Sequence, residues 1–131
     1  MSWYLTIRGA PDYSRFAATA QLVEFLAAMP ELRQTSPVQF EAANGQPWVC
    51  LILANCDPRG NYRTDGAFLP RVNVVELVCS HSGDPRWYDA LACRIAAFLD
   101  WSAFEDHEER QVWPPIERRQ AEPVAAPDPA T

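Results

Sequence analysis

The sequence predicts an α+β fold: a two-layer sandwich in which a mainly antiparallel sheet of about five strands carries two helices on one face. Short segments with apolar residues at every second position are typical of strands, and two longer segments with apolar residues three and four apart are typical of helices. Their order along the chain is β-α-β-β-β-α-β, which favours helices packed on one side of a sheet. A length of 131 residues suits one domain, and we assign residues 1–113 to it.

The first predicted elements are a strand at 2–8 and a helix that ends near Met29. In SWYLTIR, apolar and polar residues alternate, so one face of the strand is expected to be buried. GAPDYS then interrupts the pattern, and either Asp12 or Ser14 can cap the helix that follows. Pro30 ends this segment.

A β-hairpin is predicted next. Its arms are a short strand at 38–41 and a longer strand at 48–54, and Asn44 and Gly45 between them both accept a positive φ. The second arm is apolar on both faces, as expected of a central strand.

A long loop at 55–71 leads to a further central strand, VNVVELVCS at 72–80, and then to the clearest helix of the sequence, GDPRWYDALACRIAAFLDW. Asp84 stands at the predicted N-cap of that helix, and Pro85 stands at its first helical position. A last strand is expected at 108–113. The Pro- and Ala-rich tail at 114–131 has too few large apolar residues to order itself and is predicted to be disordered.

Composition excludes some functions. The net charge is −6 and all 11 basic residues are arginine, which disfavours nucleic acid as a partner and fits either an oppositely charged protein or simple solubility. No apolar stretch approaches the length of a membrane span, and the N-terminus lacks the pattern of a secretory signal, so we expect a cytoplasmic protein without a membrane partner. The four cysteines are expected to be free thiols, and their spacing predicts no metal site. No motif predicts a cofactor.

The loop at 55–71 is the first candidate site. Loops of this length are usually functional or disordered, and mixed arginine, tyrosine and acidic residues are typical of protein interfaces. The alternative is a flexible, solvent-exposed loop without a function, which the aromatic residues Tyr62 and Phe68 disfavour. The candidate partner-binding residues here are Asp57, Arg59, Tyr62, Arg63, Asp65 and Phe68.

The second candidate site is the acidic segment at 100–109, which could also be an ordinary solvated segment. If it lies on the same side as the loop, the two form a negative surface with an aromatic and arginine rim. Its candidate partner-binding residues are Glu105, Asp106, Glu108 and Glu109.

Glu76 is the third candidate, because it interrupts an apolar strand. Its carboxylate is expected either to face an open side of the sheet or to be held by an arginine, since an unpaired buried charge is costly. A catalytic base is a sharper alternative, but no nucleophile or phosphate-binding motif accompanies it.

The strands SWYLTIR, WVCLILAN and VNVVELVC and the helix GDPRWYDALACRIAAFLDW resemble, in overall plan over residues 1–113, the small cytoplasmic immunity proteins that bacteria encode beside secreted or contact-delivered toxins. The resemblance implies a non-catalytic protein that binds a cognate toxin and covers its active site. It carries over no residue roles, and it leaves open whether the toxin is basic.

Two alternatives remain. The first is a small enzyme or ligand-binding domain that uses Glu76, Tyr4 and Arg8 on an open sheet face. The second is an assembly subunit that dimerises through edge strands. The sequence does not decide between a monomer and a homodimer.

Overall fold

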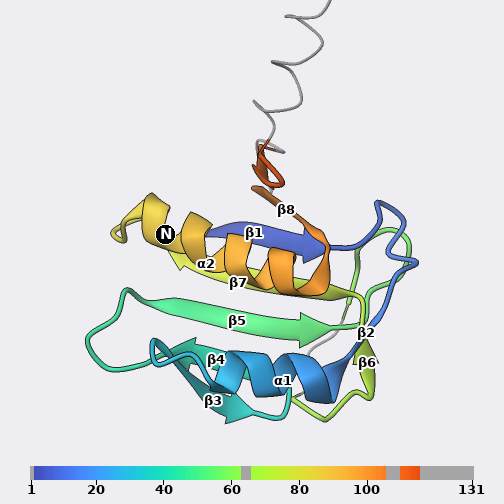
Figure 1. Cartoon of the computed structure of the whole chain (residues 1–131), viewed down its shortest axis with the longest axis horizontal. Coiled ribbons are helices and arrows are strands. Elements are labelled where there is room, and N and C mark those ends of the chain that lie inside the picture. The colour runs from blue at the N-terminus through green and yellow to red at the C-terminus, as the bar shows by residue number, and fades with distance from the viewer. Residues whose placement is uncertain (1, 63–65, 106–109, 116–131) are drawn as a thin grey trace, which may run out of the picture.

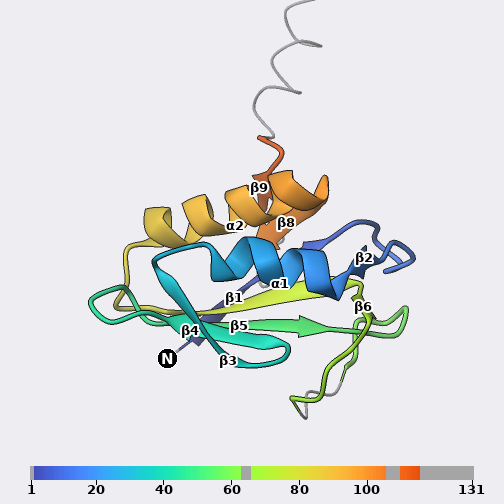
Figure 2. The ribbon, with the colours of Figure 1, turned by 60° about the horizontal axis from the view of Figure 1, so that its bottom comes forward.

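The structure is a computed structural model that describes residues 2–62, 66–105 and 110–115. It confirms the α+β class: two helices pack on one face of a mainly antiparallel sheet (Figures 1 and 2). The helices are α1 (Thr19–Ala27) and α2 (Pro85–Leu99). The strands are β1 (Ser2–Arg8), β2 (Ala17–Ala18), β3 (Leu32–Ser36), β4 (Gln39–Ala42), β5 (Val49–Ala54), β6 (Arg71–Val72), β7 (Val74–Ser80), β8 (Ser102–Glu105) and β9 (Gln111–Trp113).

The main sheet has the strand order β3-β4-β5-β7-β1-β8-β9, and all of its neighbours are antiparallel. Strands β2 and β6 form a separate two-stranded ribbon. The central strands are therefore β5, β7 and β1, which agrees with the apolar character of their sequences.

The core lies between the sheet and the two helices. Strand β1 contributes Trp3, Leu5 and Ile7, and each is at most 8% exposed, as the alternating sequence predicts. Leu22 of α1 and Leu91 of α2 are fully buried against the same face. Truncating a fully buried leucine to alanine costs about 2–5 kcal/mol, so this layer supplies much of the stability.

Helix α2 begins where the sequence predicts. The Asp84 side chain accepts a hydrogen bond from the Arg86 backbone N–H at 2.9 Å, and Pro85 is the first helical residue. Asp100 ends the helix in the left-handed conformation at φ 58°. The predicted hairpin is also confirmed, since β4 pairs with β5 and Gly45 between them has φ 86°.

The start of the first helix differs from the prediction. The Asp12 carboxylate accepts the backbone N–H of Ser14 at 3.1 Å, which makes a local turn and not a helix cap. Tyr13 has φ 61°, which a helix cannot continue through. The helix begins only at Thr19, after β2 has paired with β6, and it ends at Ala27.

The sheet has more strands than the sequence analysis predicted. β3 and β8 were both missed, because LRQTS is polar and exposed at the sheet edge and SAFE lies in the acidic segment. Asn73 separates β6 from β7, where one continuous strand was expected. The predicted last strand at 108–113 corresponds to β9, and residues 108 and 109 lie outside the described part of the chain.

The structure also bears on the expectations for the cysteines, for membrane spans and for the C-terminal tail. All four cysteines are free thiols, although only Cys79 is fully buried. Neither α1 nor α2, the helices of the described part, is long and apolar enough to cross a membrane. The predicted disordered tail lies almost wholly outside the described residues, since only Pro114 and Pro115 of it are described.

Candidate functional site

The sheet face opposite the two helices is the first candidate surface. A row of register partners crosses five strands on this side: Gln39, Ile52, Glu76, Thr6 and Phe104. A second row contains Cys50, Val78 and Tyr4. These eight side chains, together with Arg8, are exposed or half-buried, whereas their neighbours along the strands are mostly buried, and we call the nine the open face. Figure 2 shows both helices on the other side of the sheet.

Glu76 lies at the centre of the open face. Its Oε2 accepts a hydrogen bond from the Thr6 hydroxyl at 2.6 Å, and its Oε1 accepts one from the Tyr62 hydroxyl at 3.4 Å. Glu76 therefore lies on the side of the sheet opposite the helices, where it is half-buried and accepts hydrogen bonds from two hydroxyl groups. The contact with Tyr62 also joins the sheet to the predicted loop.

The loop between β5 and β6, residues 55–70, is called the rim loop. Asn73, which is 1% exposed, fixes its base: the side-chain Oδ1 accepts the Cys56 N–H at 2.8 Å, and Nδ2 donates to the Cys56 carbonyl at 2.9 Å. Nδ2 also donates to the Tyr13 carbonyl at 3.1 Å. One buried amide thus pins the rim loop and the 9–16 loop to the same end of the sheet.

Within the rim loop, Asp57 builds a tight turn. Its Oδ1 accepts the backbone N–H groups of Arg59 and Asn61 at 2.9 and 3.0 Å, and Gly60 has φ 89°. Beside this turn is a hollow of about 500 Å³ lined by Asn55, Asp57, Asn61, Tyr62 and Leu69. Asp57 therefore has a structural role, while the Arg59 backbone takes part in the turn and its side chain is exposed.

Two groups beside Glu76 are held in their protonated forms. Burial and the carboxylates of Asp57 and Glu76 raise the pKa of the Cys56 thiol to about 11. Burial, together with the charge and hydrogen bond of Glu76, raises the pKa of the Tyr62 phenol above its usual value. Neither group is ionised near neutral pH, which makes Cys56 a poor nucleophile and Tyr62 a poor base.

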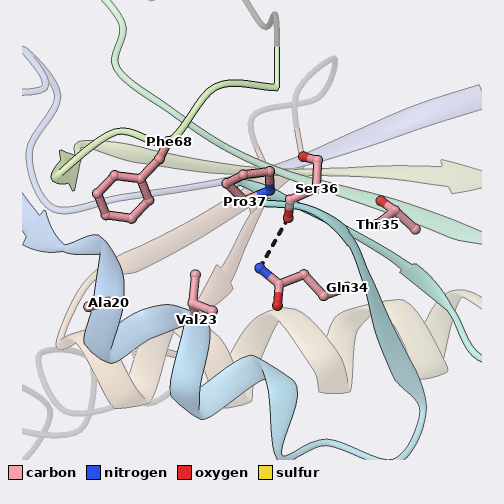
Figure 3. Close-up of a pocket in the computed structure, with 7 residues that line it drawn as sticks. All are labelled: Ala20, Val23, Gln34, Thr35, Ser36, Pro37 and Phe68. Carbon is pink, nitrogen blue, oxygen red and sulfur yellow. Dashed lines mark hydrogen bonds between the residues drawn. The ribbon is translucent and has the colours of Figure 1, made fainter.

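Phe68 lies elsewhere, away from Glu76. Figure 3 shows its ring at the edge of a groove whose lining also includes Ala20 and Val23 of α1 and Pro37. The groove has a volume of about 640 Å³, and the Phe68 side chain is 54% exposed. Phe68 and Tyr62 thus belong to different surfaces, which their shared loop did not reveal.

Glu105 is on the helix side of the sheet. Arg110 joins it to α2, with Nε 2.8 Å from Glu105 Oε1 and Nη2 3.2 Å from Asp89 Oδ1. The negative charge of Glu105 therefore has an arginine partner within the fold. As a partner-binding residue it stays a prediction, and its position separates it from the open face.

Five of the predicted partner-binding residues lie outside the described part of the chain. They are Arg63, Asp65, Asp106, Glu108 and Glu109. The described structure brings together only Tyr62 and Glu76 from the predicted set, with Asp57 and Arg59 in the adjoining turn.

Several residues of this region were not among the predicted site residues: Thr6, Tyr13, Cys56, Asn73 and Phe104. A signal existed for Thr6, because strand alternation in SWYLTIR places Tyr4, Thr6 and Arg8 on one face. No pattern in the sequence brings Tyr13 beside Asn73, since the two are 60 residues apart.

Comparison with protein-family models, with curated proteins and with solved structures found no match. No group of three or more metal-ligating side chains is found within residues 2–62, 66–105 and 110–115. The groups that the open face offers to a partner or ligand are hydroxyl groups, one central carboxylate, one arginine and flanking aromatic rings, all carried by the sheet.

Proposed function

We propose that this chain is a non-catalytic protein-binding module that uses the open face and the adjoining turn of the rim loop. The observation that carries the proposal is that neither α1 nor α2 covers this side of the sheet: Ile52, Glu76 and Thr6 are adjacent in the register, are half-buried and face away from both helices. A rigid sheet presents such side chains with little loss of entropy on binding, which favours recognition of a second folded surface.

The composition of this face supports a protein partner. Tyrosine and arginine are over-represented among the residues that dominate binding energy, and the open face contributes Tyr4 and Arg8. Apolar Ile52 and Val78 lie beside them and are half-buried. A net charge of −6 favours a partner with a basic surface, because opposite charges accelerate encounter.

In its specific form, the proposal follows the resemblance to immunity proteins: the partner is a bacterial toxin, and binding covers its active site. On this view the protein works in the cytoplasm, where it protects the cell that makes it. Cys56 and Tyr62 have raised pKa values and stay protonated near neutral pH. Because neither offers a reactive anion there, this supports a binding role over a catalytic one.

The test uses the purified product of the adjacent reading frame as the partner. Calorimetry should show a stable complex, and Tyr4→Ala should weaken it by about 2 kcal/mol, roughly thirtyfold in Kd. Phe98→Ala is the matched control, because Phe98 is an exposed aromatic residue on α2, 47% exposed against 36% for Tyr4. Deleting the gene should make cells sensitive to that product.

The proposal fails if no complex forms and deletion causes no sensitivity. It also fails if Phe98→Ala weakens the complex and Tyr4→Ala does not, because the helix side would then be the binding surface.

A small ligand-binding domain or enzyme is the second candidate. It is favoured by the hollow of about 500 Å³ that Tyr62 lines, because the Tyr62 hydroxyl is also hydrogen-bonded to Glu76. A metabolite that co-purifies with the protein and is lost in Tyr62→Phe or Glu76→Gln would support it. Turnover of any substrate by the pure protein would replace the first proposal with this one.

A further inference from the structure

Arg8 ends β1 on the open face, and aromatic groups hold its guanidinium in place. Its Cζ lies 5.2 Å from the centre of the Tyr13 ring and 5.1 Å from the centre of the Phe104 ring. Its Nη1 donates a hydrogen bond to the Tyr13 hydroxyl at 3.1 Å. These contacts use the ring faces and one N–H, so they leave several donors of the guanidinium available.

Arg8 has no carboxylate partner in the described part of the chain. Four other arginines each form an ion pair there with Asp or Glu: Arg33, Arg86, Arg94 and Arg110. Arg15, Arg59 and Arg71 likewise have no ion pair with the described carboxylates, but all three are exposed, whereas Arg8 is half-buried.

A hollow of about 100 Å³ adjoins Arg8 and includes in its lining the Phe104 residue on which the guanidinium packs. Its lining residues are Arg8, Gly9, Ala10, Pro11, Ser102 and Phe104. It could hold about three waters at their liquid volume of about 30 Å³ each, which is room for a carboxylate group and its first carbon atoms. Ser102 is the register partner of Arg8 on β8 and adds a hydroxyl group to the lining. We call this space the Arg8 hollow.

The walls of the Arg8 hollow are tightly built. A Cβ atom at Gly9 would lie 2.7 Å from Trp101 Nε1 and 2.8 Å from Arg15 Cβ, so no larger residue fits there without a shift. Tyr13, whose hydroxyl accepts the Arg8 hydrogen bond, takes a left-handed φ of 61°, a conformation that costs a non-glycine residue about 1 kcal/mol or more.

We infer that the Arg8 hollow is a carboxylate-binding site. A guanidinium packed against rings presents its N–H edge, which matches the planar, two-oxygen geometry of a carboxylate. A phosphate would need more clustered positive charge than this acidic protein offers. In the proposed complex, this site would receive an acidic side chain or a chain terminus of the partner, but the site itself does not depend on that proposal.

The experiment is an NMR titration of the whole protein that follows the Arg8 Nε–Hε and Ser102 amide signals. Three probes are added at constant ionic strength: N-acetylglutamic acid α-amide, which has only a side-chain carboxylate; N-acetylglycine, which has only a terminal one; and N-acetylglutamine amide, which has none. Each of the two carboxylate probes should give saturating shifts. The probe that binds more tightly shows whether the site prefers a side-chain carboxylate or a terminal one. The neutral probe should give none.

Two variants sharpen the result. Arg8→Gln should weaken the binding roughly tenfold or more, which is the effect of losing a charge-assisted hydrogen bond. Arg71→Gln changes an exposed arginine that also packs on an aromatic ring, with its Cζ 4.2 Å from the centre of the Phe16 ring, and it should leave the binding unchanged. If Arg8→Gln does not fold, the three titrations of the unmodified protein still decide the matter.

Equal shifts from the neutral probe would overturn the inference, as would the absence of saturating shifts with both carboxylates. Tighter binding of inorganic phosphate than of either carboxylate would also overturn it, because the ligand class would then be wrong.

Discussion

The Asn73 side chain binds both backbone groups of Cys56, accepting its N–H at 2.8 Å and donating to its carbonyl at 2.9 Å. Asn73 is buried between β6 and β7, and Cys56 begins the rim loop. This pair holds the start of the rim loop at this end of the sheet, although the described residues of the loop, 55–62 and 66–70, contain no helix or strand.

Replacing Asn73 with alanine should therefore destabilise the protein by about 2 kcal/mol, because polar backbone groups of Cys56 and Tyr13 lose their partner. Chemical denaturation measures the change in unfolding free energy. Asn55→Ala is the matched control, since the neighbouring Asn55 is exposed, and it should cost less than about 0.5 kcal/mol. Equal losses from the two variants would contradict the anchoring role.

The Cys56 thiol should become more reactive when Asp57 loses its charge. Asp57 helps to raise the pKa of Cys56, after burial, to about 11. Asp57→Asn keeps the side-chain oxygen that accepts the N–H groups of Arg59 and Asn61, so the turn is retained while the charge is removed.

Alkylation rates between pH 8 and 11 check this expectation, with Cys56→Ser used to subtract the other thiols. The Asp57→Asn profile should shift to lower pH, because the thiolate is the reactive form. An unchanged or higher midpoint would show that Asp57 does not act on Cys56.

The ion pair of Glu105 with Arg110 favours a structural role for Glu105 over the partner-binding role predicted from the sequence, and substitutions can separate the two. Glu105→Gln should lower stability by less than about 1 kcal/mol, because its ion pair with Arg110 is partly exposed, and it should not weaken the binding of a partner. Asp89→Asn removes the other carboxylate on Arg110 and should behave in the same way. If Glu105→Gln lowers the affinity for the partner tenfold and Asp89→Asn does not, Glu105 contacts the partner and the structural role is wrong.

Sequence patterns predicted the central elements well because these obey local rules. The alternation around Leu5 and the Asp84–Pro85 helix start each need only a few neighbouring residues, and both are confirmed. The start of α1 at Thr19 was missed because it depends on β2 pairing with β6, more than 50 residues away. Local signals at Asp12 pointed to a cap, and tertiary pairing decided otherwise.

The site was harder to predict than the fold. Glu76 and Tyr62 were both selected for their residue types, but only the folded chain brings them together. Phe68 and Glu105 were grouped with them by proximity in sequence or by charge, and the structure places them on other surfaces. The contacts of the Arg8 guanidinium could not be predicted either, because they involve rings from two other segments of the chain, those of Tyr13 and Phe104.

The most direct test of the proposed function is hydrogen–deuterium exchange of the protein with and without its bound partner. Binding on the open face should slow exchange in strand β8, which carries Phe104, and in the rim-loop turn at 57–61, and leave the exposed ends of α1 and α2 unchanged. Protection confined to the two helices, with β8 and the turn unaffected, would contradict the proposal that the open face is the binding surface.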